Sequence, residues 1–317
     1  MRTIRLGTRG SKLALRQAEL AAAALKAAVP GLAAELFIIK TTGDKILDTP
    51  LSEIGDKGLF TKEIELALLD NSIDMAVHSC KDLPSELAPG LVIAAVLPRE
   101  NPCDVLLSSA GYSLETLPHA ARIGTSSLRR TAQLKALRPD FVVLPLRGNV
   151  ETRIRKMEAD SLDAIVLARA GIARLGLMDK ATQTLSADLM LPSPGQGAIA
   201  IEARTGDNEI LEILSKINDA KTNCEVRAER SFLLRLHGGC QVPVGCLARA
   251  DRDTISITGM IASLDGRQVF KDAIEGNARD AEMLGLQLAE RLLAAGANEI
   301  LNIVGAGPRA CPDTHYV

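Results

Sequence analysis

Two proline-containing breaks constrain the fold of this chain more than any other feature of its sequence. The first spans residues 98–102 and the second residues 191–197. Because proline fixes φ and removes a backbone donor, helices and interior strands seldom run through such segments. Before and between the breaks, short apolar runs alternate with helically spaced ones, a pattern typical of βα units and a mostly parallel sheet. We therefore predict two hinged α/β domains, with the chain leaving the first, building the second and returning.

The expected elements follow from these patterns. In the first domain we expect strands at residues 4–9, 35–41, 73–77 and 91–96, helices at 13–28 and 62–70, and a returning strand at 199–203. In the second we expect strands at 105–108, 122–124, 141–145 and 164–167, and helices at 128–137, 150–159 and 169–175. In such a two-domain clamp the ligand binds in the cleft, beside the carboxyl ends of the parallel strands.

A third, smaller α+β unit is predicted from residue 220, where the pattern changes. We expect helices at 224–236 and 280–295, strands at 244–250, 254–262 and 268–275, and a disordered tail at 305–317. The predicted boundaries are 1–97 with 198–217 for domain one, 103–191 for domain two and 220–317 for domain three.

Composition argues against several classes of protein. The net charge is −2 and the aromatic residues are five Phe, two Tyr and no Trp, whereas a nucleic-acid surface needs a basic face and stacking rings. No run approaches the roughly 20 apolar residues of a membrane span, and no apolar leader opens the chain, so we expect a cytoplasmic protein without a membrane partner. The six cysteines form no CxxC pair, so we expect reduced thiols and no metal site. Without an apolar dimerisation stripe, we expect a monomer.

Positive charge is concentrated in the second domain. Residues 122–156 hold nine Lys or Arg and two acids, a net charge of +7 in a chain whose net charge is −2. At one predicted strand end, Gly124-Thr125-Ser126-Ser127 precedes a helix that opens with Arg129 and Arg130. Backbone N–H groups, hydroxyls and guanidiniums therefore converge on one helix N-terminus, which is typical of an anion site.

The next strand end repeats this arrangement with Arg147, Asn149 and Arg153. Solvated arginines on a helix face are the plainer interpretation, but the ends of these strands face the predicted cleft. Arginine suits planar carboxylates and phosphates. We therefore expect a multiply charged anion as the ligand.

The first domain offers matching pieces. Arg9 and Ser11 follow its first predicted strand, where a helix begins. Residues 55–62 are predicted to form a glycine-containing loop that acts as a lid and carries Lys57 and Phe60. Phe60 could equally belong to the core. A complete P-loop motif is missing, so nucleotide binding through one is not supported.

Asp82 stands in the stretch His78-Ser79-Cys80-Lys81-Asp82-Leu83-Pro84, after a predicted strand. The residue before a proline favours extended geometry, so we expect Lys81 and Asp82 to project from a loop. Neighbouring cations would keep Asp82 ionised, able to stabilise a cationic intermediate and accept a proton. A surface-turn aspartate is an equally open interpretation. His78 reads as structural, because no Ser or Asp motif accompanies it.

Cys240 lies in a turn between Gly238-Gly239, which resembles a helix C-cap, and Pro243. The small glycines leave the thiol accessible, but the negative end of the preceding helix disfavours a thiolate. The cysteine therefore resembles an attachment point more than a nucleophile. A buried structural cysteine is the alternative.

Taken together, these segments resemble the porphobilinogen deaminase (hydroxymethylbilane synthase) family. The matching stretches are Gly7-Thr8-Arg9-Gly10-Ser11, Gly58-Leu59-Phe60-Thr61-Lys62-Glu63, His78-Ser79-Cys80-Lys81-Asp82-Leu83-Pro84, Gly124-Thr125-Ser126-Ser127-Leu128-Arg129-Arg130, Leu146-Arg147-Gly148-Asn149-Val150 with Thr152-Arg153, Pro194-Gly195-Gln196-Gly197 and Gly238-Gly239-Cys240-Gln241-Val242-Pro243. Each is weak alone, but they occur in family order over nearly the whole chain.

The resemblance implies three domains, the first two hinged like a periplasmic binding protein, and a dipyrromethane cofactor joined to Cys240 by a thioether. It also implies a transferase of tetrapyrrole biosynthesis that joins four porphobilinogen molecules head to tail, releases ammonia at each step and yields hydroxymethylbilane. Loss of ammonia leaves a cationic azafulvene, an electrophile strong enough that the anchoring thiol needs access more than a low pKa.

Carried over position by position, the resemblance makes Asp82 the catalytic carboxylate. The cations for acetate and propionate groups are Arg9, Lys81, Arg129, Arg130, Arg147, Arg153 and Arg174, supported by Ser11, Ser126, Ser127, Asn149 and Gln196. Many family members have a lysine where Glu53 stands, so a cationic contact there is in doubt, and Cys80 receives no role.

A non-catalytic two-domain clamp for a small polyanion is the main alternative. The third domain with Cys240 and the missing secretion signal argue against it. A cysteine-nucleophile hydrolase is a weaker choice, because no histidine stands in a recognisable motif.

Overall fold

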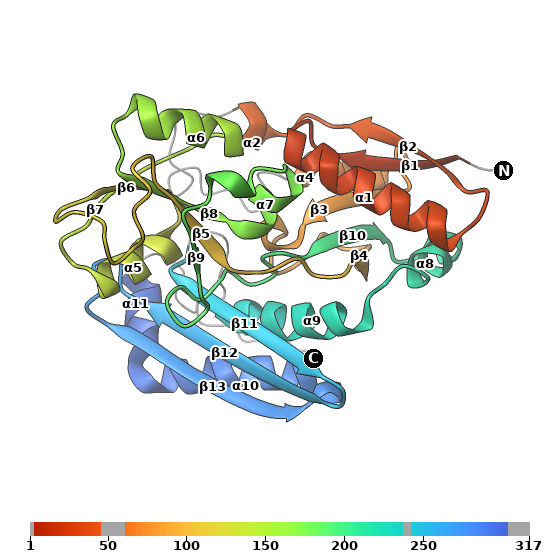
Figure 1. Ribbon diagram of the computed structural model, residues 1–317. Helices are drawn as coiled ribbons and strands as arrows, with labels where there is room; N and C mark the ends of the chain where they lie inside the picture. The colour runs from red at the N-terminus through yellow and green to blue at the C-terminus, as the bar shows by residue number, and fades with distance from the viewer. Residues whose placement is uncertain (1–2, 46–60, 237–241, 304–317) are drawn as a thin grey trace.

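Figure 1 shows a computed structural model of the chain, with β-sheets covered by helices. The structure describes residues 3–45, 61–236 and 242–303. Within these ranges there are two five-stranded sheets and one three-stranded sheet. The predicted class, two α/β domains plus a small C-terminal α+β domain, is confirmed, whereas the limits given for the three domains stay a prediction.

The first sheet has the strand order β2-β1-β3-β10-β4. Its strands are β1 (Thr3–Thr8), β2 (Ala33–Ile38), β3 (Met75–Ser79), β4 (Leu91–Val96) and β10 (Ile199–Arg204). Strand β1 is parallel to β2 and β3, whereas β10 is antiparallel to β3 and β4. The one strand that runs against the other four is therefore the predicted returning strand.

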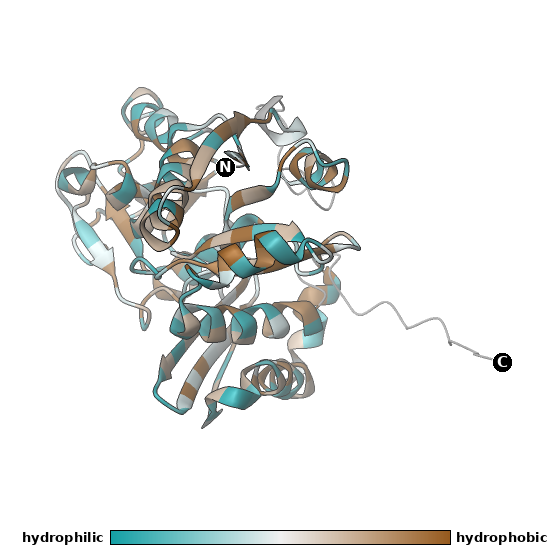
Figure 2. Cartoon of the chain, turned by 90° about the vertical axis from the view of Figure 1, so that its right-hand side faces the viewer, coloured by the Kyte–Doolittle hydropathy of each residue, from teal (hydrophilic) through white to brown (hydrophobic). Residues whose placement is uncertain are grey.

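Helices cover both faces of the first sheet. On one face, α1 (Lys12–Ala28) and α8 (Asn208–Ser215) pack with apolar residues of β1, β3 and β10 in one core. On the other face, α4 (Lys62–Leu69) packs through Ile64 and Leu68. Short helices at α2 (Thr42–Lys45) and η1 (Cys80–Asp82) follow β2 and β3. Figure 2 shows hydrophobic residues on the strands and on the helix faces turned toward them.

The second sheet repeats this plan with the order β7-β6-β8-β5-β9. Its strands are β5 (Asp104–Leu107), β6 (Arg122–Gly124), β7 (Val142–Leu144), β8 (Ala164–Ala168) and β9 (Gln183–Leu185). Strand β6 is parallel to β7 and β8, and β5 is antiparallel to β8 and β9. Its helices are α5 (Leu128–Leu137), α6 (Val150–Ala159), α7 (Arg169–Arg174) and η2 (Met178–Lys180).

Two neighbouring segments join the two α/β domains, as predicted from the proline-containing breaks. Leu97 N donates to Ile199 O at 3.0 Å and Glu100 N donates to Gly197 O at 3.2 Å. Gly197 has φ +91°, and a Cβ there would lie 2.3 Å from Glu100 O. Glycine is required at this position because any side chain would push the two hinge segments apart.

The third sheet is an antiparallel meander of β11 (Val244–Asp251), β12 (Thr254–Ala262) and β13 (Val269–Asn277). Its main core packs against α9 (Ala220–Arg235) and α10 (Ala281–Leu292). The segments η3 (Ala278–Asp280), η4 (Leu293–Ala297) and α11 (Asn298–Ile303) complete the described chain. Helix α9 ends at Arg235 with Leu236 as its C-cap, and the predicted C-cap Gly238-Gly239 and the tail at 305–317 lie outside the described residues.

Several elements were not predicted, among them β9, α8, α2, η2 and α11, and one prediction needs correction. Strand β9 has three residues and α8 has eight, and neither was proposed from the sequence. Lys81 and Asp82 lie in a turn of 3₁₀-helix and not in an open loop. Each five-stranded sheet is mostly parallel, as predicted, with one reversed strand, because the chain crosses between the domains through β5 and β10. Among the described helices, none is long and apolar enough to cross a membrane.

Candidate active site

Asp82 is held at the end of a buried strand. Four of the five residues of β3 are buried, and the strand leads directly into the 3₁₀ turn η1. Cys80 N donates to Ala198 O at 3.0 Å, which fastens the turn to the returning hinge segment. Leu83 has ψ 141°, the extended geometry expected before Pro84. The turn therefore has a fixed place, with Lys81 and Asp82 both partly exposed.

A pocket of about 60 Å³ opens beside this turn. Its lining includes Arg9, Ser11 and Asp82, three residues predicted to act together although Asp82 is far from the other two in the sequence. The remaining lining residues are Leu13, Ala14, Gln17, Thr61, Val77, His78 and Ser79. Ser11 is also the N-cap of α1, where its hydroxyl accepts from Ala14 N at 3.2 Å. The first domain therefore supplies a cation, a hydroxyl and a carboxylate to one small pocket.

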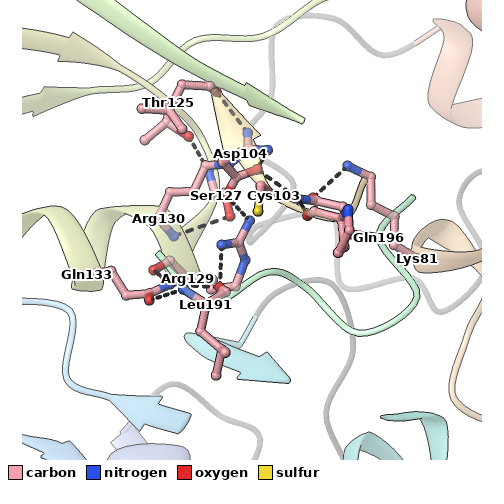
Figure 3. A network of polar contacts seen from close by, with 12 residues as sticks. Lys81, Cys103, Asp104, Thr125, Ser127, Arg129, Arg130, Gln133, Leu191 and Gln196 are labelled. Atoms are coloured by element: carbon pink, nitrogen blue, oxygen red, sulfur yellow. Dashed lines mark hydrogen bonds and ion pairs between the residues drawn. The ribbon is translucent and has the colours of Figure 1, made fainter. Parts of the chain in front are cut away.

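The arginines of the second domain meet on a carboxylate that was not predicted, Asp104 (Figure 3). Asp104 is fully buried, and it accepts from Arg129 Nη2 at 2.9 Å and from Arg130 Nη2 at 2.7 Å. Arg129 Nη1 also donates to Leu191 O at 2.7 Å, and Arg130 Nη1 to Val166 O at 2.9 Å. Both arginines are thus buried and tightly held, unlike solvated residues on a helix face.

Charge balance explains why Asp104 can be buried there. Burial alone would raise the pKa of Asp104, but the charges of Arg129 and Arg130 outweigh that effect and lower the pKa. Burial lowers the pKa of Arg129, and Asp104 offsets part of that loss. In the sequence, the only signal for Asp104 is an acid placed directly before the apolar run of a predicted strand.

Gln196 connects this cluster to the first domain. Its Nε2 donates to Asp104 Oδ1 at 2.8 Å and to Pro102 O at 2.7 Å, while its Oε1 accepts from Lys81 Nζ at 3.2 Å. Burial lowers the pKa of Lys81 to about 8, with Arg130 and Arg129 acting in the same direction and Asp82 and Asp104 opposing them. The polar network therefore begins at Lys81, next to Asp82, and crosses the hinge through Gln196. It ends at Asp104 and the two arginines that contact it.

Arg147 and Arg153 add uncompensated positive charge to this region. Arg147 Nη1 is buried and has no hydrogen-bond partner among the described residues. Arg153 Nε donates to Gly148 O at 2.7 Å. The pKa of Arg153 is lowered to about 10, mainly by burial and also by the charges of Arg130 and Arg147, while Asp82 opposes them. Arg153 stays protonated at neutral pH, in surroundings that favour an added anion.

Four further predicted residues lie in supporting positions. Ser126 Oγ donates to Leu146 O at 3.1 Å and accepts from Leu146 N at 2.9 Å, which ties together the segments after β6 and β7. Ser127 and Asn149 are the N-caps of α5 and α6. Arg174 Nη2 donates to Gly197 O at 2.7 Å, and burial lowers the pKa of this arginine.

Other candidates are structural or lie outside the described residues. His78 is buried, with Nε2 at 3.2 Å from Glu202 Oε2, in agreement with a structural role. Cys80 is also buried, and burial raises the pKa of its thiol to about 11. Cys240, Lys57, Phe60 and Glu53 lie outside the described residues.

Comparison with known proteins decides the family. A family model described as porphobilinogen deaminase, dipyromethane cofactor binding domain, matches residues 4–212, and a model of the porphobilinogen deaminase C-terminal domain matches residues 223–294. The chain belongs to the porphobilinogen deaminase family. A porphobilinogen deaminase of Syntrophomonas wolfei is 57% identical over 95% of this chain and 98% of its own length. One from Moorella thermoacetica is 53% identical over 96% of this chain and 97% of its own length.

Similarity to solved structures is much weaker. The periplasmic VFT2 domain of Bordetella pertussis BvgS has 14% sequence identity and a TM-score of 0.42, over 72% of this chain and 92% of that domain.

The donors present suit the anionic dipyrromethane of the porphobilinogen deaminase family. Arg129 Nε, Arg130 Nε and Arg147 Nη1 are buried donors without a hydrogen-bond partner among the described residues. An unpaired buried donor costs about 1–3 kcal/mol, and an acceptor on a ligand would remove that cost. Carboxylate groups are the acceptors that guanidiniums bind best. The residues therefore fit a group that carries several carboxylates.

Proposed function

We propose that this chain is a hydroxymethylbilane synthase, which joins four porphobilinogen molecules head to tail with loss of ammonia at each step. The observation that carries the proposal is the arrangement of Asp82 beside a cluster of arginines, in a chain that matches the porphobilinogen deaminase family over nearly its full length. Such a reaction needs a carboxylate near a developing positive charge and cations for many substrate carboxylates.

Asp82 is proposed as the catalytic carboxylate. It would stabilise the positive charge that develops when ammonia leaves the substrate, and it would accept the proton released as two rings join. Its place beside Lys81 supports this role, because Lys81 is joined through Gln196 to Asp104 and its two arginines.

The proposed binding groups fall into two sets. Arg9 and Ser11 share the pocket of Asp82 and would bind the ring that reacts there. The second set comprises Lys81, Arg129, Arg130, Arg147, Arg153, Arg174 and Gln196, with Ser126, Ser127 and Asn149 holding their loops. These would bind acetate and propionate side chains of the cofactor and the growing product.

Cys240 is proposed to carry the dipyrromethane through a thioether, and Lys57 and Phe60 to lie on a lid. When bound, dipyrromethane would supply the pyrrole to which the first substrate is joined. The polyanion-binding clamp without catalysis is not favoured, because the chain matches the family through its C-terminal domain as well.

Intact mass measurement of the purified native protein tests the proposal. We expect a mass above that of the unmodified chain, and we expect Cys240→Ala to lose the added mass and the turnover of porphobilinogen together. A native mass equal to that of the bare sequence would reject the proposed function. Three further expectations also stay predictions: a monomeric state, a cytoplasmic location and the absence of nucleic-acid partners. Sedimentation at several protein concentrations would test the monomeric state.

A further inference from the structure

Asp104 occupies the point where the hinge enters the second domain. It is the first residue of β5, two residues after Pro102, and its side chain is 0% exposed. Figure 3 shows the side chains of Arg129, Arg130 and Gln196 turned toward it. Few aspartates are buried without a strong reason, because a carboxylate loses hydration there.

The two oxygens of Asp104 divide their partners in a specific way. Oδ2 accepts from Arg129, and Oδ1 accepts from both Arg130 and Gln196. Each guanidinium therefore donates from one terminal nitrogen to Asp104 and from the other to a backbone carbonyl. That carbonyl is Leu191 O for Arg129 and Val166 O for Arg130. The Nε of each remains buried without a partner among the described residues. Asp104 and the two backbone carbonyls thus fix the orientation of both arginines, with the Nε of each left unpaired among the described residues.

Gln196 links Asp104 to Lys81 of the first domain. Its amide donates to Asp104 through Nε2, so its Oε1 must point away, and there it accepts from Lys81 Nζ at 3.2 Å. A glutamine has one donor end and one acceptor end. Asp104 Oδ1 and Pro102 O together therefore fix the orientation of this amide, and with it the position of Lys81 beside Asp82.

We propose that Asp104 is a positioning residue for the reaction, which orients Arg129 and Arg130 directly and Lys81 through Gln196. This inference rests on the proposed function and adds a residue that touches neither the substrate nor Asp82. A purely structural ion pair is the competing interpretation. That interpretation predicts a loss of stability and a lower pKa of Lys81 through the lost charge alone, by an amount that does not depend on Gln196.

The first experiment measures Lys81 in the full-length protein. Nuclear magnetic resonance titration of ¹³C-labelled lysine side chains, with Lys81→Arg for assignment, would give its pKa in wild type, Asp104→Asn and the control Asp140→Asn. The charged groups that act on Lys81 are Asp82, Arg130, Asp104 and Arg129. Because a negative charge is removed and two cations stay, we expect Asp104→Asn to lower the pKa of Lys81 by about one unit or more. Asp140 pairs with Arg138 in the same domain at 2.7 Å and should leave Lys81 unchanged.

The second experiment separates kcat from KM, counted per cofactor-bearing chain by intact mass. At about pH 6, where Lys81 stays charged in both proteins, the positive charge that attracts carboxylates is kept in Asp104→Asn. We therefore expect KM at this pH not to rise, whereas kcat falls by about tenfold or more, the effect of one charged hydrogen bond. If Asp104→Asn does not fold, Gln196→Met retains the ion pairs and removes only the connection. It should lower both the pKa of Lys81 and kcat, because a hydrogen bond to the charged form is lost.

The outcomes distinguish this inference from the proposed function. A shift in the pKa of Lys81 on Asp104→Asn that is equally large in a Gln196→Met background would overturn the positioning role, even if the wild type carries cofactor and turns over substrate. Where only Gln196→Met folds, an unchanged pKa of Lys81 in that variant would overturn it. A wild type without added mass would reject the proposed function, while a shift in the pKa of Lys81 that depends on Gln196 would still support the connection from Asp104 to Lys81.

Discussion

At the scale of single residues, the site is dominated by an excess of positive charge around few acids. One buried carboxylate, Asp104, faces two guanidiniums, and burial lowers the pKa values of Lys81 and Arg153 nearby. Such an arrangement is costly in the absence of a ligand and becomes favourable when an anion binds. The charge states of these residues should therefore control how strongly an anionic ligand binds.

Lys81 should make activity depend on pH. Its pKa of about 8 means that it carries a charge below that pH and loses the charge as the pH rises through 8. We expect KM for porphobilinogen to rise between about pH 7 and pH 9 in the wild type, because a cation for carboxylates is lost. In Lys81→Arg the charge persists, so the KM for porphobilinogen should not rise over this pH range. Identical profiles for the two proteins would contradict the assignment.

Asp82→Asn should retain the cofactor but lose most of its turnover. An asparagine matches the shape of the carboxylate but has neither its charge nor its basicity, so we expect kcat to fall by about 10²–10⁴-fold. Steady-state kinetics on protein of verified intact mass provide the measurement. Glu86→Gln, an exposed acid four residues along the same segment, is the matched control and should have near-normal kcat. Near-normal turnover of Asp82→Asn would remove it from the catalytic role.

At the scale of elements, helix α9 holds the two hinge segments in place through hydrogen bonds to one of its carboxylates. Glu229 of α9 is 0% exposed and accepts from Arg99 Nη1 at 2.7 Å, from Gly195 N at 2.6 Å and from Ala248 N at 2.8 Å. Arg99 and Gly195 belong to the two different hinge segments, and Ala248 belongs to β11. One carboxylate therefore joins both hinge segments to the third sheet.

Glu229→Gln should consequently destabilise the whole fold. The change leaves Arg99 buried without its main charged partner, and breaking a buried ion pair costs about 3–5 kcal/mol. Chemical denaturation with circular dichroism would measure the loss. Glu282→Gln breaks the exposed pair with Arg227 and should cost less than about 1 kcal/mol. Equal losses in the two variants would show that the hinge contact is not a major source of stability.

Gly197→Ala tests the close approach of the hinge segments. Glycine at φ +91° can be replaced only with backbone strain, and the added Cβ would meet Glu100 O. We expect a loss of about 1–3 kcal/mol in unfolding free energy. Gly206→Ala serves as the comparison, because a Cβ there has open space, and its stability should stay close to that of the wild type.

At the scale of the whole molecule, two similar α/β domains bring their charged groups to one hinge, and the third domain packs against both. α9 contributes Val226 to a core with Cys80, Val96 and Ala198, while Met260 of β12 packs with Ala132 of α5 and Leu191. The arginine site therefore lies among elements that are held in place from three directions.

Removal of the cofactor should lower thermal stability. An anionic group bound between the arginines would relieve their repulsion in the folded state only, so ligand binding stabilises it. We expect the cofactor-free Cys240→Ala protein to unfold several degrees below the cofactor-bearing wild type in calorimetry. Added salt should narrow this difference, since ions screen the repulsion. A higher unfolding temperature in Cys240→Ala would contradict this account.

The sequence alone determined the class of the fold and most of its elements, because hydrophobic periodicity and proline breaks act locally. Ser11, Ser127 and Asn149 were recognisable at helix starts for the same reason, and ordered motifs indicated the family. Only the tertiary structure showed that Asp104 lies beneath Arg129 and Arg130, that Gln196 bridges to Lys81, and that Glu229 joins the hinge segments. These contacts join residues far apart in the chain, and burial makes them strong, so no local pattern could reveal them.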